Sequence, residues 1–269
     1  MEIWAVLLLA LLPGLGNFAG GMLAEFRGAS PRMLNFALHA ASGIVIGIVA
    51  AELLPAALDG LAGWWIALAV AAGGVAYVLI EAGVERLQQK KGTGTDRTSM
   101  WMIYVAVAVD LTADGVMLGS GTAVSLAFGV TLAAGQVLAD LPEGFAAVAD
   151  LRENGVPRKR RIMLSASFIL YCVGAALLAY LLLRGAPDAV KLAALAFAAG
   201  LLSVAAVEDM LDEAHEARED THGSVLAFVG GLALFVLVSA GLETVLGDDP
   251  HDSAQSEAIR SEGARSPGG

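Results

Sequence analysis

The sequence contains few of the residues on which soluble and disulfide-stabilised proteins depend. One cysteine, Cys172, occurs in 269 residues, so the chain cannot form an internal disulfide bond. Charged residues make up 16% of the chain and histidine occurs 4 times, whereas hydrophobic residues reach 57% and the mean hydropathy is +0.70. This apolar share is above that of soluble domains, so the composition predicts a polytopic membrane protein.

A basic N-terminal segment is also missing. The chain begins with MEIWAVLLL, and no Lys or Arg precedes Arg27. A cleavable signal peptide begins with positive charge, so we expect the first apolar segment to remain as a membrane-spanning helix. We expect Cys172, which lies within an apolar segment, to be a small buried side chain.

Long apolar segments fill most of the chain. A spanning helix needs about 20 apolar residues, because each residue rises about 1.5 Å and the hydrocarbon core is about 30 Å thick. Eight segments meet this requirement: 3–25, 33–58, 61–85, 100–123, 125–150, 162–183, 188–210 and 224–246. The predicted fold is therefore all-α, with eight transmembrane helices in one domain over residues 1–246. The polar residues 247–269 are expected to form a disordered tail.

The basic residues are divided unequally between the two sides of the predicted bundle. Loops after the first, third, fifth and seventh segments hold 12 of the 16 Lys and Arg residues. Because basic loops stay in the cytoplasm, both termini are predicted to be extracytoplasmic. Short loops and the missing signal peptide indicate a bacterial inner membrane. The net charge of −11 is split between two faces, and no nucleic-acid partner is expected.

Acidic residues interrupt the fourth and fifth apolar segments. VAVDLTADGVMLGSG contains Asp110 and Asp114, and VLADLPEGFAAVAD contains Asp140 and Glu143; each pair lies on one helical face. A carboxylate in a spanning helix costs about 2.5–3.5 kcal/mol on the insertion scale, so such residues indicate function. Four carboxylates that face each other must hold protons or a cation. A divalent cation would neutralise half of their charge.

Two neighbours of the acids are expected to supply further oxygen atoms. Pro142 has no N–H group, so the carbonyl oxygen of Leu138 loses its helical partner and can turn toward the acids. Thr112 lies between the two aspartates of the fourth segment and offers a hydroxyl group. The sequence therefore predicts a metal site made of oxygen atoms.

Two hexads in these segments resemble a paired motif of a known family. DLTADG (110–115) and ADLPEG (139–144) are similar to the H-N-x-P-E-G and (H/Q)-(N/D/E)-x-P-E-G hexads on helices four and five of the ZIP (Zrt/Irt-like protein) divalent-metal transporters. AASGIVIGIVAAELLPAAL (40–58) and AAGLLSVAAVEDMLDEAHE (198–216) resemble that family's second and seventh helices. The resemblance covers about residues 3–246 and implies a divergent member of prokaryotic type. It implies transport of zinc, iron or manganese into the cytoplasm.

The resemblance also assigns roles to single residues. Asp110 stands at the family's first histidine on helix four and Asp114 at its glutamate, while Asp140 and Glu143 match the second hexad. The family's asparagine, proline and His or Gln positions are occupied here by Leu111, Ala113 and Ala139. Without histidine, the site suits Mn²⁺, Fe²⁺, Mg²⁺ or Ca²⁺, and Zn²⁺ also accepts carboxylates. Tyr171 stands where some members have a glutamate for a second metal, so one metal site is expected.

A path for the metal is expected from an internal similarity. Segments two and seven can be superposed at Gly43 and Gly200, which aligns Glu52 with Asp209. Similarity between segments that cross the membrane in opposite directions is typical of inverted transporter repeats. Glu52 is expected to capture metal at the outer side. The expected exit ligands on the cytoplasmic side are Glu208, Asp209 and Asp212.

The acids leave several functions open. Transport of a divalent metal of the Zn, Fe or Mn class is expected, with proton displacement on binding. No cofactor is expected, and the transported metal ion (Zn²⁺, Fe²⁺ or Mn²⁺) would occupy the transport site. A proton or monovalent-cation carrier could use the same acids without a divalent metal. A membrane-embedded metalloenzyme is less expected, because no Ser, Cys or His stands near the acids in sequence. A purely structural role would leave the cost of the buried acids uncompensated. The expected partners are divalent metal ions and the lipid bilayer, and a homodimer stays open.

Overall fold

The computed structural model describes residues 3–28, 30–89, 95–211, 214 and 222–246, and these residues are helical apart from short turns. The helices are α1 (Ile3–Arg27), α2 (Pro31–Ile48), η1 (Val49–Leu53), α3 (Leu54–Leu58), α4 (Gly63–Gln89), α5 (Thr95–Val124), α6 (Leu126–Glu153), α7 (Arg158–Leu183), α8 (Asp188–Ala205), η2 (Ala206–Leu211) and α10 (His222–Leu246). The elements η1 and η2 are short π-helices that continue α2 and α8. The prediction of an all-α fold is therefore confirmed. The predicted tail, 247–269, lies outside the described residues.

Seven helical segments of the described chain are long and apolar enough to cross a membrane. They are Ile3–Arg27, Pro31–Leu58, Gly63–Val84, Met100–Val124, Arg158–Leu183, Asp188–Glu208 and His222–Leu246. The 28-residue helix α6 is not among them, and it carries Gln136, Asp140 and Glu143. Because these polar side chains are buried, neighbouring helices rather than lipid surround this face of α6.

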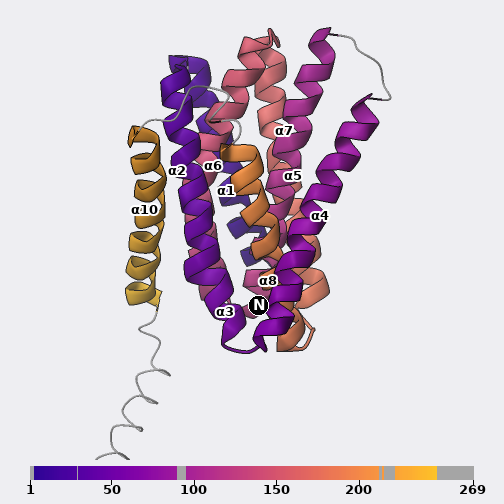
Figure 1. The fold of residues 1–269 in the computed structure, drawn as a ribbon, viewed down its shortest axis with the longest axis vertical. Coiled ribbons are helices and arrows are strands. Elements are labelled where there is room, and N and C mark those ends of the chain that lie inside the picture. The colour runs from indigo at the N-terminus through magenta and orange to yellow at the C-terminus, as the bar shows by residue number, and fades with distance from the viewer. Residues whose placement is uncertain (1–2, 29, 90–94, 212–213, 215–221, 247–269) are drawn as a thin grey trace, which may run out of the picture.

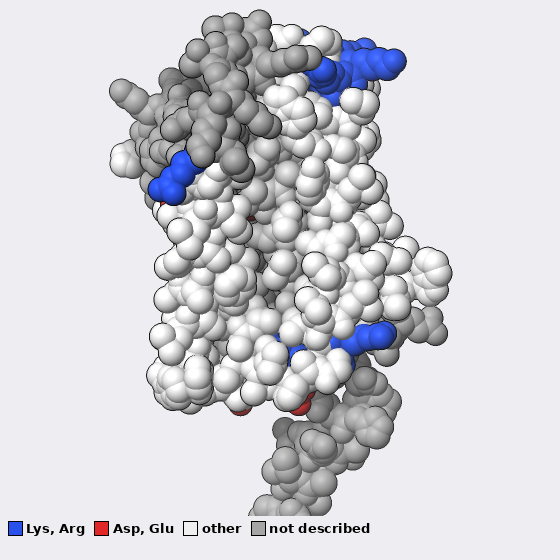
Figure 2. All heavy atoms as spheres, turned by 90° about the vertical axis from the view of Figure 1, so that its right-hand side faces the viewer, with Lys and Arg blue, Asp and Glu red and all other residues white. Residues whose placement is uncertain are grey.

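Successive helices run up and down a bundle (Figure 1). The N-terminal end of α1 and the C-terminal end of α10 both lie toward the lower end of the bundle. On the face drawn in Figure 2, the charged side chains lie near the two ends, and the surface between them is uncharged. An uncharged band between charged ends is the surface that a bilayer requires.

Glycines allow α1 to pack directly on α6, and α5 on α7. A Cβ atom added to Gly20 of α1 would lie 1.8 Å from the carbonyl oxygen of Leu141. One added to Gly144 of α6 would lie 1.9 Å from the carbonyl oxygen of Asn17. In the second pair, a Cβ atom on Gly115 of α5 would lie 2.4 Å from a carbonyl oxygen of α7. Such close approach of backbones is the usual role of small residues in membrane helices.

The helix pairs α2/α10 and α4/α8 share one packing feature: in each pair, a glycine of one helix faces a backbone carbonyl group of the other. A Cβ atom on Gly43 would lie 2.0 Å from the carbonyl oxygen of Phe228 in α10, and one on Gly200 would lie 2.1 Å from that of Val70 in α4. The partner helices return the contact through their own glycines. Gly231 of α10 faces the carbonyl oxygen of Ala40 in α2, and Gly73 of α4 faces the carbonyl oxygen of Phe197 in α8. The two glycines that align segments two and seven in sequence thus have equivalent structural roles.

The two π-helices also occupy equivalent positions. η1 begins at Val49 and η2 at Ala206, each 6 residues after its aligned glycine. A π-turn widens the helix and displaces its backbone hydrogen bonds, and such turns are frequent at functional sites. At η2, the hydroxyl of Ser42 from α2 donates a hydrogen bond to the carbonyl oxygen of Ala206 at 2.9 Å. α2 and α8 therefore both pass into a π-helix at the same distance from their aligned glycines.

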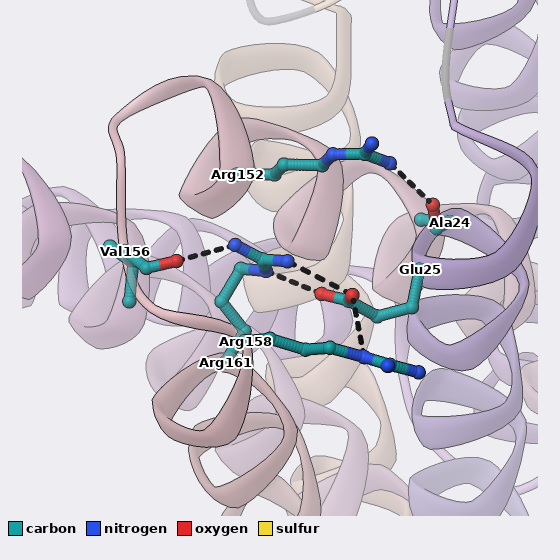
Figure 3. Close-up of polar contacts among 6 residues, drawn as sticks. All are labelled: Ala24, Glu25, Arg152, Val156, Arg158 and Arg161. Atoms are coloured by element: carbon teal, nitrogen blue, oxygen red, sulfur yellow. Dashed lines mark hydrogen bonds and ion pairs between the residues drawn. The ribbon is translucent and has the colours of Figure 1, made fainter.

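An ion-pair cluster joins α1 to α7 at the upper end of the bundle (Figure 3). The Glu25 side chain is only 3% exposed, and its Oε2 accepts a hydrogen bond from Arg161 Nη2 at 2.9 Å. Arg158 Nε lies 3.5 Å from the same oxygen. Arg152 at the end of α6 donates to the carbonyl oxygen of Ala24 at 3.4 Å. Three helix ends are thus fixed together where the basic residues gather.

Candidate metal centre

Three acidic side chains from α5 and α6 meet inside the bundle, and we call Asp114, Asp140 and Glu143 the carboxylate cluster. One carboxylate oxygen from each lies within 4.8 Å of the others, and the three residues are 0%, 0% and 6% exposed. Asp110, one turn before Asp114, is 4% exposed and lies beside Glu143. Three of the four acids that the spacing predicted to face one another thus lie together. The structure adds that Asp110 stands at the edge of the cluster rather than within it.

The carboxylate oxygens of the cluster have few hydrogen-bond donors. Gln136 Nε2 donates to Asp140 Oδ1 at 2.9 Å, one turn earlier on α6. Neither oxygen of Asp114 has a hydrogen-bond partner of good geometry, and the same holds for Asp140 Oδ2 and Gln136 Oε1. A buried polar atom without a partner costs about 1–3 kcal/mol, and more if it is charged. Unpartnered buried oxygens beside a group of carboxylates are a donor set suited to a cation.

Sequence reasoning missed Gln136, although a signal for it was present. Gln136 is the one amide side chain in the apolar part of its segment, and it stands four residues before Asp140. That spacing puts the two side chains on the same helical face. Gln136 holds Asp140 in place with its amide nitrogen and leaves its carbonyl oxygen as a further neutral donor.

Apolar side chains fill the space between α2 and α6 next to the cluster. The fully buried Phe235 of α10 enters this space: its Cε2 would lie 2.4 Å from a Cβ atom on Gly135. Its Cδ1 would lie 3.0 Å from a Cβ atom on Gly47 of α2. Ile48 also reaches Gly135, the residue before Gln136. The glycines therefore make room for an apolar layer on one side of the cluster.

The outer and inner ligands expected from the sequence do not join the carboxylate cluster. Glu52 lies on η1 and is half-buried, and it accepts a hydrogen bond from the Ser239 hydroxyl of α10. Glu208 lies on η2, and it is exposed. Asp209 also belongs to η2, but its side chain and the whole of Asp212 lie outside the described residues.

Thr112 does not face the acids, so the expectation that it supplies a ligand is wrong. Its hydroxyl donates to the carbonyl oxygen of Ala108 at 2.6 Å, and the side chain is exposed on the outer face of α5. The physical reason is helical geometry: a residue two positions from Asp110 and Asp114 points away from the face that they share. α6 continues through Pro142 without a break.

Two adjacent residues of α7, Tyr171 and Cys172, lie on opposite sides of that helix. Tyr171 is 38% exposed and its hydroxyl lies 3.1 Å from that of Tyr104, on the outer side of the helix. Cys172 is 0% exposed and lies on the inner face of the helix. Cys172, rather than its neighbour Tyr171, therefore faces the interior of the bundle, and the group of acids close enough to share a metal ion does not include it.

Comparison with known proteins adds no assignment. No protein-family model matches the sequence, and no curated protein matches it significantly. The fold is all-helical, and its apolar helices are consistent with an integral membrane protein. The function must therefore be argued from the carboxylate cluster and from the arrangement of the helices around it.

Proposed function

We propose that this chain is a ZIP-like transporter that carries divalent metal cations of the Zn, Fe or Mn class across a membrane toward the cytoplasm. The observation that supports this most strongly is the carboxylate cluster: three acids from two helices, with donor atoms within 4.8 Å of one another in the bundle interior. Three adjacent carboxylates repel one another, and a divalent cation relieves that repulsion and takes up the unpaired oxygens.

The distribution of basic residues supports the direction of transport. Most of them lie at the upper end of the bundle in Figure 1, where α1 ends and α7 begins. Those in the described helices are Arg27, Arg32, Arg86, Arg97, Arg152, Arg158, Lys159, Arg160 and Arg161, whereas Arg184 and Lys191 are at the opposite end. By the positive-inside rule, the upper end is cytoplasmic and both termini are extracytoplasmic. A bacterial inner membrane is proposed for the same reasons as in the sequence analysis.

The equivalent helix pairs support alternating access. The glycine-packed pair α2/α10 corresponds to the pair α8/α4, with α2 equivalent to α8 and α10 equivalent to α4. Equivalent helices run in opposite directions through the bundle. The pairs α1/α6 and α7/α5 correspond in the same way. This is the pattern of an inverted repeat, in which one half of the bundle moves against the other around a fixed central site. Eight helical segments, with α6 as the fifth, form such an arrangement.

The proposed path has three stages. The metal enters at Glu52 on the extracytoplasmic side, binds the carboxylate cluster with Asp110 beside it, and leaves toward η2. The exit ligands are Glu208, Asp209 and Asp212. Binding of the cation displaces protons from carboxylates that are crowded together, and its release allows them to return. Oxygen donors of this kind suit Mn²⁺ and Fe²⁺ and are also accepted by Zn²⁺.

Uptake by proteoliposomes tests the proposal. Wild type, Asp114→Asn and Glu143→Gln are compared with Mn²⁺, Fe²⁺, Zn²⁺, Cd²⁺ and Mg²⁺, and Asp59→Asn, an exposed acid, is the control. We expect saturable uptake of at least one metal in wild type and control, and its loss in both cluster variants. Uptake in the cluster variants within about twofold of wild type would refute the site, since such a change is smaller than about 0.5 kcal/mol. Metal-independent proton flux would instead favour a proton carrier.

A further inference from the structure

We propose that a groove between α5, α7 and α8 holds an acyl chain of an anionic phospholipid, whose phosphate group binds Arg184 and Lys191 at the mouth of the groove. This site is separate from the proposed transport function, because it lies on the outer surface of the bundle and needs no metal at the carboxylate cluster. By the proposed orientation, the lipid belongs to the extracytoplasmic leaflet.

Helix packing leaves the groove open. α7 and α8 each pack on α5 but make little contact with each other, although they are consecutive in the chain. A cavity of about 540 Å³ is lined by Val116 of α5, by Leu178 and Leu182 of α7 and by Ala194 of α8, among others. Leu178 and Leu182 are 61% and 71% exposed. The described part of the chain therefore leaves this apolar surface uncovered, and in a bilayer it faces lipid.

The lining of the groove suits a hydrocarbon chain. Among the described residues, it contains no charged side chain and three hydroxyl groups. The Thr112 hydroxyl is bonded to its own helix, the Tyr171 hydroxyl lies 3.1 Å from that of Tyr104, and Ser120 is 0% exposed. An ion or a polar headgroup therefore finds no polar partner within the groove, whereas an acyl chain needs none.

The length of the groove matches one leaflet of a bilayer. Its lining on α7 includes Tyr171 and Leu183, which are 12 residues apart and thus separated by about 18 Å along the helix axis. Half of a hydrocarbon core of about 30 Å is about 15 Å. A spanning helix of a second copy would cross both leaflets. An acyl chain that enters from one side occupies the length that the groove offers.

Two basic residues lie at the end of the groove near the membrane surface. Arg184 directly follows Leu183, and Lys191 is three residues before Ala194, or about one helical turn. Figure 2 shows Lys and Arg side chains near this lower end, below uncharged surface. Lys191 pairs with Asp188 at 3.0 Å, but the Asp188 side chain is 89% exposed and such surface pairs are weak. Long basic side chains reach toward the headgroups, and two of them favour a lipid with net negative charge.

Photocrosslinking in nanodiscs tests the proposal. The metal-free full-length protein is placed in phosphatidylcholine nanodiscs with a small fraction of phosphatidylglycerol that carries a diazirine in one acyl chain. Labelled peptides are then mapped by mass spectrometry. In a second sample, diazirine-labelled phosphatidylcholine replaces the phosphatidylglycerol. We expect labelling by phosphatidylglycerol to concentrate on residues 170–183 and to exceed labelling by phosphatidylcholine there by about tenfold.

A bulky side chain in the groove should exclude the acyl chain. Gly174 lines the groove, and a Cβ atom there meets nothing within 4 Å, so Gly174→Trp should fold and lose the labelling of α7. Gly230→Trp is the matched control, because a Cβ atom at this glycine of α10 also meets nothing within 4 Å. It should keep the labelling of wild type. Thermal unfolding checks that both variants are folded.

Removal of the two cations tests the recognition of the headgroup. Arg184→Gln combined with Lys191→Gln should lower labelling by phosphatidylglycerol about tenfold, to the level of phosphatidylcholine. Arg27→Gln combined with Lys159→Gln removes two exposed cations at the opposite end and should leave the labelling of α7 unchanged.

Two results would overturn the proposal. Labelling spread evenly over the lipid-facing helices, whichever headgroup carries the diazirine, would show that ordinary bilayer lipid covers the groove. A wild-type dimer that Gly174→Trp separates into monomers would show that a second copy covers it. Neither result bears on metal transport, because the labelling is measured without metal.

Discussion

Glu25 and Asp114 are both buried carboxylates, and they differ in what surrounds them. Glu25 at the upper end of the bundle receives two arginines, one of them through two nitrogen atoms. Asp114 in the centre is less exposed than Glu25, yet neither of its oxygens has a partner. A buried acid whose charge is matched by fixed cations holds helices together. A buried acid without such fixed cations is suited to bind a metal cation that enters and leaves.

The largest effect on stability is expected at Glu25. Glu25→Gln leaves Arg161 buried without its anion, so the free energy of unfolding should fall by about 3 kcal/mol. Metal uptake per folded molecule should stay within about twofold of wild type. Denaturant unfolding in detergent micelles and proteoliposome uptake measure the two quantities.

A double variant provides the control for this pair. Glu25→Leu with Arg161→Leu removes both charges and should recover most of the lost stability, because no unpaired charge stays buried. If Glu25→Gln abolished uptake at unchanged stability, the contrast between a structural acid and a binding acid would fail.

Removal of the charge at Asp114 is expected to abolish metal binding without lowering stability, the opposite of the result expected at Glu25. In Asp114→Asn, an unpartnered buried carboxylate becomes an uncharged amide, so the metal-free protein should be as stable as wild type or more stable. Wild type should gain about 2.7 kcal/mol from a metal present at 100 times its dissociation constant, and the variant should gain none. Thermal unfolding with and without metal measures both. Equal metal stabilisation of variant and wild type would contradict the assignment.

The equivalent helix pairs allow a comparison between the two halves. Gly43→Ala and Gly200→Ala each place a Cβ atom about 2 Å from a carbonyl oxygen, so each should lower the free energy of unfolding by about 1–3 kcal/mol. Gly230→Ala is the matched control, because an added Cβ atom there meets nothing within 4 Å. Denaturant unfolding checks all three. A large loss at one of the two glycines and none at the other would argue against an internal repeat.

A smaller effect is expected at Gln136, which binds Asp140 rather than standing among the acids. Gln136→Leu should weaken metal affinity by about tenfold and leave the fold intact, because it removes the hydrogen bond that orients Asp140 and one neutral oxygen donor but no carboxylate. Isothermal titration measures the affinity. Thr131→Val, which alters a hydroxyl bonded within the same helix, should leave it unchanged. Unaltered affinity in Gln136→Leu would remove Gln136 from the site.

The smallest effect is expected at Thr112. Thr112→Val removes a hydroxyl that bonds to its own helix on the outer face, so uptake should change by less than about twofold. The same proteoliposome measurement applies. A loss comparable to that of Asp114→Asn would restore Thr112 as a ligand and would mean that α5 turns during transport.

Much of the fold followed from hydropathy, because a helix must satisfy its backbone hydrogen bonds internally wherever lipid surrounds it. The eight apolar segments correspond to helical segments of the structure, including the two segments that contain a π-helix. α6 was also predicted as a helix, although its polar residues keep it outside the helical segments that are apolar enough to cross a membrane. The π-turns themselves were not predicted, because they depend on how neighbouring helices displace the backbone.

The site was predicted in part. The spacing of Asp140 and Glu143 predicted that they share a helical face, and the structure puts both beside Asp114. Thr112 was assigned to the site by proximity in sequence, which ignores that face. Tyr171 and Cys172 are consecutive in the sequence. Only the packing of α7 on α5 decides which of the two faces the interior.

The sequence by itself determined the class of fold and the residues that are costly to bury, because both follow from local composition and helical period. It also determined which acids share a face. The tertiary structure alone decided which acids have partners. Glu25 meets Arg161 across 136 positions of the chain, whereas Asp114 lies beside the acids Asp140 and Glu143 of another helix. Such contacts depend on how glycines let helices approach, and a carboxylate's role depends on the charge that this approach puts beside it.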